Sequence, residues 1–314
     1  MIKRTLYFGN PAYLKTANEQ LIIEFPDSPP SPRFLSEAEG SGEGSGVRSA
    51  PIEDVGLLIL DHQQITITQS LLAKLLANNT AIITCDDTHH PTGMMLSLDG
   101  HTLQSQKFQA QVEATVPLKK QLWQQTVAAK IENQAAMLAF RREENKLLLN
   151  LAASVKSGDS ENAEAQAAAY YWKRVFPDFL EFTRERYGPP PNNLLNYGYA
   201  ILRALVARSL VASGLLPTLG IHHRNQYNAY CLADDIMEPY RPYVDFIVYQ
   251  IIRTNGKYLE MSPSMKKALL ELPAMDVKID GKKSPLMNAV QRTTASLAKC
   301  FEGTTRKLLY PEFQ

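Results

Sequence analysis

The hydrophobic pattern changes its period near residue 104, and this change constrains the fold more than any other feature. Before residue 104, short segments rich in β-branched and aromatic residues are bounded by turn-forming residues such as Pro26 and Asp27, which is typical of strands. After it, apolar residues recur every three to four positions, as along one face of a helix. The sequence therefore predicts an α+β chain, with a small β-rich domain over residues 1–103 and a larger all-α domain over residues 104–314.

The expected elements follow from the same two patterns. In the first domain we expect a helix over residues 69–78 and strands over residues 2–8, 20–25, 55–60, 64–68 and 81–84. In the second domain Pro117 marks a kink or a new helix start, and we expect helices over residues 104–140, 161–176, 194–213, 226–237, 242–254 and 289–310. Residues 28–50 have the Pro, Gly and Ser content of a flexible insertion.

Composition excludes several classes of protein. The three cysteines, Cys85, Cys231 and Cys300, are too few and too scattered for a disulfide scaffold, and they fit a reducing cytoplasm. No apolar run approaches the ~18 residues that a membrane span needs, and we expect no signal peptide and no membrane partner. Neither G-x-G-x-x-G nor G-x-x-x-x-G-K-[ST] occurs, so we expect no nucleotide cofactor.

Charge is divided unevenly along the chain. Residues 1–105 contain 6 Lys and Arg against 12 Asp and Glu, whereas residues 106–314 contain 27 against 20. Such a split indicates that the C-terminal part meets a polyanion such as nucleic acid, although an ordinary solvated surface also explains it.

Acidic residues in apolar surroundings mark a candidate metal site. Glu164 lies on an alanine-lined helical face, and Asp234, Asp235 and Glu238 are spaced so that they can crowd one helix face. Crowded carboxylates repel one another unless a cation neutralises them. The preceding His222-His223 pair adds an imidazole, and one His with two carboxylates suits Mn²⁺ or Mg²⁺.

Simpler interpretations of these residues stay open. Glu164 can be an acid that complements the dipole of a helix start, and the Asp234–Glu238 segment can be solvated. Zinc with Cys231 fits less well, because the spacing does not match a structural zinc site. The Cys85–Gly93 segment, with its adjacent histidines, looks like a second metal or nucleophile site. It follows a buried-type strand and leads into a turn, so we favour structural packing there.

Five segments together resemble the CRISPR-associated integrase family (Cas-one), the DNA-cutting and DNA-joining subunit of spacer acquisition. They are spread over nearly the whole chain apart from residues 28–50. The sequence as a whole is most similar to family members from type II systems, of the II-C branch. The segments are Arg4–Tyr7, Pro51–Val55, Thr84–Gly93, Leu195–Leu202 and Leu232–Asp245.

The resemblance implies a site made of an acid, a histidine and a second acid. These fall on Glu164, His223 and Glu238, as catalytic residues and ligands of Mg²⁺ or Mn²⁺, with Asp235 as a supporting acid. Ala165 stands where Gly is common, Glu238 stands where many relatives have Asp, and His222 beside His223 leaves the ligand open by one residue. Flanking Arg224 and Arg241 can clamp DNA phosphates or pair with the local acids. Tyrosines 171, 197, 199 and 227 are interpreted as packing residues or platforms.

The resemblance also implies an activity and partners. The family inserts short DNA fragments into a CRISPR array, where the 3′-hydroxyl of the fragment attacks a phosphodiester of the repeat. The expected partners are double-stranded and branched DNA, a second copy of the chain bound through the β-rich domain, Cas-two (the small adaptation subunit) in a heterohexamer-like complex, and the type II effector nuclease. The expected location is the prokaryotic cytoplasm. A hydrolytic structure-specific nuclease and a non-catalytic DNA-binding scaffold remain alternatives.

Overall fold

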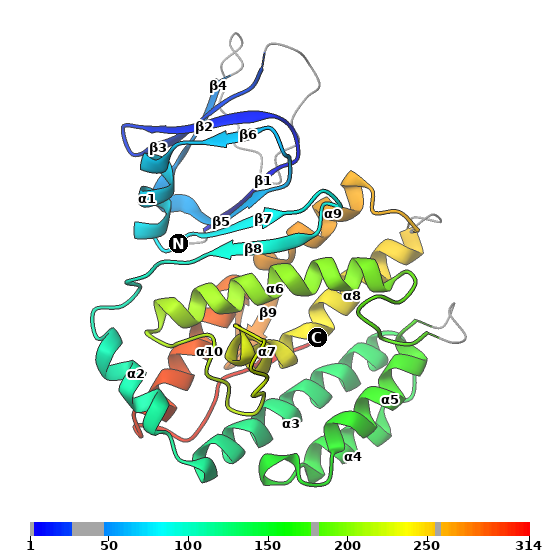
Figure 1. The fold of residues 1–314 in the computed structure, drawn as a ribbon. Coiled ribbons are helices and arrows are strands. Elements are labelled where there is room, and N and C mark those ends of the chain that lie inside the picture. The colour runs from blue at the N-terminus through cyan, green and yellow to red at the C-terminus, as the bar shows by residue number, and fades with distance from the viewer. Residues whose placement is uncertain (1–2, 27–46, 177–181, 255–258) are drawn as a thin grey trace. The chain divides into compact units, whose positions relative to one another are not determined.

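The computed structural model describes residues 3–26, 47–176, 182–254 and 259–314, which fold into two compact units (Figure 1). Unit 1 covers residues 1–100 and unit 2 covers residues 101–314. The chain is thus a mixed α+β protein with a β-rich N-terminal region and a helical C-terminal region. None of the described helices is both long and apolar enough to cross a membrane.

The described residues of unit 1 form two four-stranded sheets and one α-helix. Its elements are β1 (Arg4–Phe8), β2 (Ala12–Ala17), β3 (Gln20–Glu24), β4 (Val47–Pro51), η1 (Ile52–Asp54), β5 (Val55–Leu60), β6 (Ile65–Ile67), α1 (Gln69–Ala77), β7 (Ala81–Cys85) and β8 (Pro91–Met95). In one sheet β1, β5 and β7 run parallel and β8 adds antiparallel to β7. The other sheet has the order β4-β3-β2-β6.

The core of unit 1 explains why the sequence patterns there are readable. Leu14 and Leu21 from one sheet, Leu58 from the other and Leu71 from α1 belong to one buried cluster. The central strand β5 is buried along almost its whole length, which is why it is a continuous apolar run in the sequence. The five strands and the helix expected in this domain are all present, within a few residues of their expected bounds.

The expected insertion is shorter than predicted at its C-terminal end. Residues 47–50 were expected to be flexible, but they belong to β4, which pairs antiparallel with β3 and buries Ala50. The pairing partner, β3, lies on the other side of the Pro- and Gly-rich stretch, so local composition did not reveal it. The rest of the stretch, residues 28–46, lies outside the described residues.

Unit 2 is built mainly from helices. They are α2 (Gln104–Glu113), α3 (Val116–Phe140), α4 (Lys146–Ser154), α5 (Ala163–Val175), α6 (Asn192–Ala212), α7 (Cys231–Met237), α8 (Arg241–Thr254), α9 (Pro263–Leu270) and α10 (Leu286–Phe301), with short 3-10 turns η2 (Ser157–Asp159), η3 (Glu238–Tyr240) and η4 (Leu272–Ala274). Helices α3 and α6 are the two longest, and most of their residues are buried. Of the two alternatives for Pro117 the structure has a new helix start, because α3 begins at Val116 with Thr115 as its N-cap and Pro117 in its first turn.

The second domain is not all-α, which corrects the prediction. A hairpin of β9 (Asp276–Ile279) and β10 (Lys282–Pro285) pairs with the short β11 (Pro311–Glu312). The hairpin turns at Asp280 and Gly281, which both have positive φ, as an Asp-Gly hairpin turn requires. This dipeptide was a readable hairpin signal that the helical period of its surroundings obscured.

Two expected helices are shorter than predicted. The helix expected over 226–237 begins only at Cys231, because Asn225 and Asn228 use their side chains to cap turns before it. The helix expected over 289–310 ends at Phe301, followed by Gly303 with φ of 76°. The chain after α10 is therefore free to form β11 and to pack beside α3.

Candidate functional site

Glu164 is fixed at the start of α5 by a cap that precedes it. The side chain of Asp159 accepts hydrogen bonds from the backbone N–H groups of Ala163 (2.8 Å) and Glu164 (3.1 Å). These N–H groups lie in the first helical turn and have no partner within the helix, so the cap satisfies them. It also sets the first turn of α5 beside α3, where Glu164 meets Lys130.

Lys130 joins two acids that are far apart in the sequence. Its Nζ lies 2.6 Å from Oε1 of Glu164 and 2.6 Å from Oε2 of Glu238. The two carboxylate oxygens are therefore separated by no more than twice that distance. Glu164 and Glu238, both predicted site residues, converge on one cation position in the structure.

The Glu238 carboxylate is buried and lies between two cations. Its Oε1 accepts a hydrogen bond from Nε of Arg241 (2.8 Å), while Oε2 accepts no well-aligned hydrogen bond from the described residues although Lys130 is close. Burial by itself raises the pKa of this carboxyl, but Arg241 and Lys130 outweigh burial and hold the pKa at about 2. Glu238 is thus an anion with one oxygen that can accept a further ligand.

Asp235 organises the histidine loop. Its carboxylate accepts hydrogen bonds from the backbone N–H groups of Ile221 (2.7 Å), His222 (3.0 Å) and His223 (3.2 Å). Its Oδ1 also lies 2.5 Å from Nδ1 of His223. A Cβ on Gly220 would lie 2.4 Å from the carbonyl oxygen of His223, so this tight loop requires glycine there.

The same carboxylate prepares His223 as a ligand. The hydrogen bond to Asp235 is the main cause that raises the pKa of His223 above its usual value, ahead of the opposing effect of burial. Because Nδ1 faces Asp235, Nε2 is the ring nitrogen left to bind a metal ion. The charges of Glu164 and Glu238 also raise the pKa of His223, which places all three predicted ligands within electrostatic reach of one another.

The neighbouring histidine has a different environment. The ring of His222 stacks on Trp123 of α3, with centroids 4.1 Å apart and planes 4° apart. The ring of His223 meets the same indole edge-on, at 5.7 Å. The two histidines thus differ in packing: His222 lies on the face of the Trp123 indole, and His223 contacts the buried Asp235.

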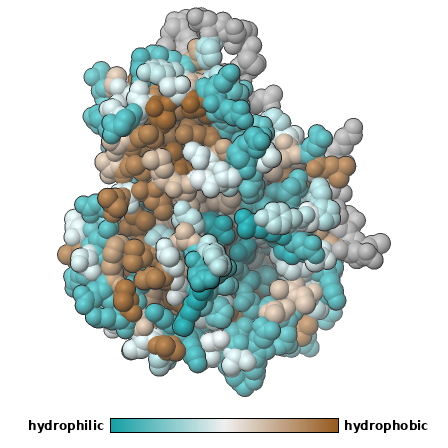
Figure 2. All heavy atoms as spheres, viewed as in Figure 1, coloured by the Kyte–Doolittle hydropathy of each residue, from teal (hydrophilic) through white to brown (hydrophobic). Residues whose placement is uncertain are grey.

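The surface around α7 is hydrophilic (Figure 2).

The three acids of the Asp234–Glu238 segment do not crowd one face, which corrects that expectation. Asp234 pairs with Arg203 of α6 (2.6 Å) and accepts a hydrogen bond from Asn228 (2.7 Å). Asp235 faces the histidine loop, and Glu238 lies beyond the end of α7. Asp234 and Glu238 pair with cations of α6 and α3, and Asp235 contacts the histidine loop, which the local spacing did not reveal.

The remaining predicted residues fall into two groups. Arg241 pairs with Glu238 and lies over the ring of Tyr199 at 4.5 Å, as the ion-pairing alternative predicted, whereas Arg224 is exposed. Tyr171 and Tyr199 donate hydrogen bonds to the buried Asp245 and tie α5, α6 and α8 together. These two tyrosines are packing residues, as is the buried Tyr197, whereas Tyr227 is exposed.

The Cys85–Gly93 segment forms the turn between β7 and β8. Asp86 accepts hydrogen bonds from the backbone N–H groups of Thr88 and His90, and His89 lies 2.9 Å from the buried Asp61. These contacts are those of a surface turn in which Cys85 is half-buried, and the structural packing of this segment stays a prediction.

The donor set fits a divalent cation in its chemistry. Two carboxylates share one cation position, one of them has a buried oxygen without a well-aligned hydrogen bond, and an imidazole is oriented by a third carboxylate. Among the described residues, however, no three His, Cys, Asp or Glu side chains already stand in a ligating arrangement. Lys130 is the residue that sequence reasoning missed. The sequence did contain one indication of its role: Lys130 lies in the largely apolar stretch Val127–Leu138, where a lysine needs acidic partners.

Comparisons with known proteins agree with this architecture. The family model described as CRISPR associated protein Cas1 matches residues 8–262. The CRISPR-associated endonuclease Cas1 of Neisseria meningitidis serogroup C is 35% identical over 99% of this chain and 97% of its own length.

Solved structures show the same fold. A casposase bound to its integration product superposes with a TM-score of 0.77 at 20% identity, covering 98% of this chain and 92% of the casposase. A Cas1 protein from Thermotoga maritima superposes with a TM-score of 0.71 at 15% identity, covering 96% of this chain and 97% of that protein. At these identities the likeness is one of fold. Together with the family model and the Neisseria relative, it leads to one conclusion: the chain belongs to the Cas1 family of CRISPR-associated proteins.

Proposed function

We propose that this protein is a metal-dependent DNA integrase that inserts short DNA fragments into a CRISPR array by transesterification. The observation that carries the proposal is the convergence of Glu164 and Glu238 on one cation position, beside a histidine oriented by Asp235. Membership of the Cas1 family supports an enzyme of the nuclease and integrase type. The fold shared with a casposase bound to integration product favours strand transfer over simple hydrolysis.

Each site residue has a distinct role in this proposal. Glu164, Glu238 and His223 would hold Mg²⁺ or Mn²⁺, and Asp235 keeps Nδ1 of His223 occupied, which leaves Nε2 as the ring nitrogen available to an ion. When bound, the ion supplies positive charge that polarises the scissile phosphate. The 3′-hydroxyl of the fragment attacks that phosphate in line, and the 3′-oxygen of the repeat leaves. One phosphodiester replaces another, so no nucleotide cofactor is required.

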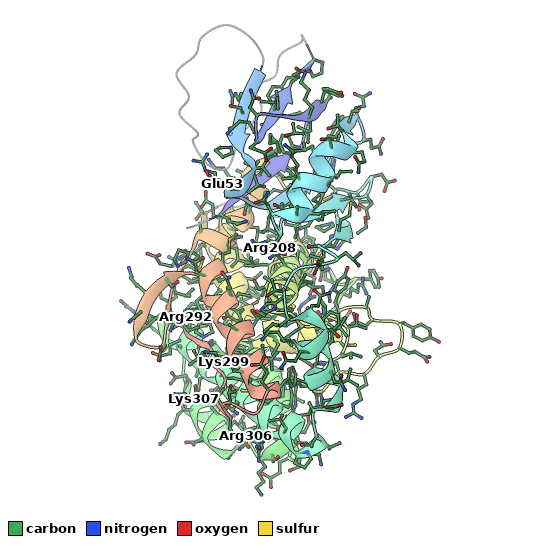
Figure 3. The ribbon with its side chains drawn as sticks, turned by 90° about the vertical axis from the view of Figure 1, so that its left-hand side faces the viewer. Glu53, Arg208, Arg292, Lys299, Arg306 and Lys307 are labelled. Carbon is green, nitrogen blue, oxygen red and sulfur yellow. The ribbon has the colours of Figure 1, made fainter. Side chains whose placement is uncertain are left out.

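The DNA contacts come mainly from unit 2 in this proposal. Figure 3 shows Arg292, Lys299, Arg306 and Lys307 along one side of this unit, on α10 and the segment after it. Lys299, Arg306 and Lys307 are exposed, whereas Arg292 pairs with Asp280. Exposed cations of this kind bind DNA phosphates without reading sequence. Arg224, exposed beside His223, is the corresponding candidate at the site itself.

The partners are part of the same proposal. One neighbour in fold belongs to a Cas6-RT-Cas1–Cas2 complex, with a TM-score of 0.72 at 20% identity. By analogy we propose that this chain dimerises through unit 1 and assembles with Cas2, the predicted Cas-two subunit, in a heterohexamer-like complex. We further propose that it works with a type II effector nuclease in the prokaryotic cytoplasm.

The test uses a branched DNA that mimics a half-integrated fragment, with Mn²⁺ or Mg²⁺. The wild type is expected to rejoin the interrupted strand and to release the branch, and a chelator should abolish the reaction. Glu164→Gln should slow rejoining by about 100-fold or more, because it weakens the charge that holds the ion. Glu161→Gln is the matched control, since Glu161 is an exposed acid of the same segment that pairs with Lys156.

Each other outcome favours a specific alternative. Cleavage without a rejoined strand would favour the hydrolytic nuclease. Binding of the DNA without any product would favour the scaffold. Equal rejoining by Glu164→Gln and the wild type would show that this carboxylate is not part of the reaction.

A further inference from the structure

Lys130 is an unusual neighbour for two metal-binding acids. It comes from the middle of the long helix α3, and its side chain is only 11% exposed. Burying an ammonium group costs free energy unless carboxylates neutralise it, and here Glu164 and Glu238 both do so. Lys130 therefore stabilises the pair of acids, and the acids stabilise the buried lysine.

The second cation at Glu238, Arg241, contacts an aromatic ring as well as the carboxylate. The guanidinium of Arg241 contacts Oε1 of Glu238 and lies over the ring of Tyr199. Lys130 donates a hydrogen bond to Oε1 of Glu164 (2.6 Å), but it approaches Oε2 of Glu238 along a flexible four-carbon side chain without a well-aligned hydrogen bond. Of the two cations, Lys130 is the one that can withdraw without breaking an aromatic contact.

The ammonium group and a divalent ion require the same oxygens. Carboxylate oxygens bind Mg²⁺ at about 2.0–2.1 Å, and an ammonium group 2.6 Å from one oxygen of each acid occupies the space in front of these oxygens. A lysine charge within a few Å of a divalent ion also repels it strongly in a buried site.

We propose that Lys130 is a positioning residue that occupies the cation position between Glu164 and Glu238, and that a divalent ion binds there by displacing its ammonium group. The inference rests on the proposed function, because it takes the two acids to be metal ligands. It assigns to Lys130 two opposite effects: it holds the acids together before the ion arrives, and it competes with the ion for them.

The first experiment measures Mn²⁺ affinity in the full-length chain by quenching of Trp123 fluorescence. Trp123 contacts both His222 and His223, and Trp123→Phe gives the contribution of the other tryptophan, Trp172. Lys130→Met is expected to bind Mn²⁺ about tenfold more tightly than the wild type, because the competing charge is gone. Its melting temperature in chelator should fall, since the buried Glu238 and the half-buried Glu164 lose their shared cation. Adding Mn²⁺ should raise the melting temperature of this variant more than that of the wild type.

The matched control is Lys156→Met. Lys156 also pairs with a glutamate, Glu161, but the pair is exposed and lies outside the site. This variant should bind Mn²⁺ as the wild type does. If Lys130→Met bound Mn²⁺ no more tightly than Lys156→Met, Lys130 would not be a competitor.

A second experiment needs no substitution at Lys130. Amine-specific labelling of the wild type, mapped by peptide mass, should leave Lys130 unmodified in chelator and modify it when Mn²⁺ is bound. Lys156 should be modified in both conditions. Protection of Lys130 in both conditions would overturn the displacement.

The outcomes separate this inference from the proposed function. Mn²⁺ binding with equal affinity in the wild type and Lys130→Met would leave the metal site standing and overturn the role of Lys130. Absence of Mn²⁺ binding in both proteins would overturn the metal site, and the inference would fall with it.

Discussion

The two units each contain a buried aspartate that contacts a histidine, and only one of the two pairs lies in the candidate site. In unit 1, Asp61 lies 2.9 Å from Nδ1 of His89, and in unit 2, Asp235 lies 2.5 Å from Nδ1 of His223. The two aspartate side chains are both 0% exposed, and the histidine side chains are 55% and 46% exposed. By pair geometry alone the two are close to equivalent.

The difference lies in what surrounds each pair. The other oxygen of Asp61 accepts a hydrogen bond from the hydroxyl of Tyr7, and the pair joins the turn between β7 and β8 to the end of β5. Asp235 accepts three backbone N–H groups, and its histidine lies within reach of the charges of Glu164 and Glu238. A His–Asp pair therefore does not define a metal site; the convergence of further carboxylates does.

The largest expected contrast is in activity. His223→Ala should reduce the rate of strand rejoining on branched DNA by about 100-fold or more, because it removes a proposed metal ligand. His89→Ala, the equivalent change in unit 1, should leave the rate within a factor of about two of the wild type.

His222→Ala serves as the neighbouring control for that contrast. It removes the stacking on Trp123 and keeps the contact of His223 with Asp235, so a smaller loss of rate is expected. A larger loss from His222→Ala than from His223→Ala would transfer the ligand role to His222.

The second contrast is in stability. Asp235→Asn should lower the free energy of unfolding by about 2–4 kcal/mol, because the amide oxygen replaces only one carboxylate oxygen, and the NH₂ group cannot accept the backbone N–H of His223 that the other oxygen accepts. Asp61→Asn should cost about 1 kcal/mol, because the hydroxyl of Tyr7 can accept as well as donate. Denaturant unfolding of both variants checks the order, and an equal loss in both would contradict the importance given to the backbone contacts.

The smallest contrast is in pH dependence. Asp235 raises the pKa of His223, so the imidazole becomes protonated, and unable to bind a metal ion, at a higher pH than an unperturbed histidine. Mn²⁺ affinity should therefore weaken as pH falls through that raised pKa. Asp235→Asn lowers the pKa of His223 and should move the midpoint of this loss to lower pH. Asp61→Asn should leave the midpoint in place.

A shift of the midpoint to higher pH in Asp235→Asn would contradict the assigned role of Asp235. An equal shift in Asp61→Asn would show that the effect does not come from the His223 environment.

The sequence predicted those elements of the fold that depend on neighbouring residues, and it did not predict those that depend on residues far away in the chain. Period and turn residues predicted five of the eight described strands of unit 1, and a kink or new helix start at Pro117, because both are properties of adjacent residues. The strand β4 and the short β11 depend on pairing with distant strands, and no local pattern indicated them.

The same limit applies to the site. The sequence singled out Glu164, Asp235 and Glu238 as acids in apolar surroundings, and the structure gives each of them a buried or half-buried partner. Lys130 pairs with Glu164 and Glu238, and Arg241 pairs with Glu238, so these two cations neutralise the two glutamates. Lys130 lies 34 positions before Glu164 in the chain. The two side chains meet because α3 packs against α5, and this packing is not visible in the sequence.

Calorimetric titration of Mn²⁺ tests the central claim, that Glu164, His223 and Glu238 form one metal site, most directly. Wild type and the control Glu161→Gln are predicted to bind one ion per chain, and Glu164→Gln, Glu238→Gln and His223→Ala are each predicted to lose that binding. Unchanged binding in all three variants, with each protein folded, would contradict the claim.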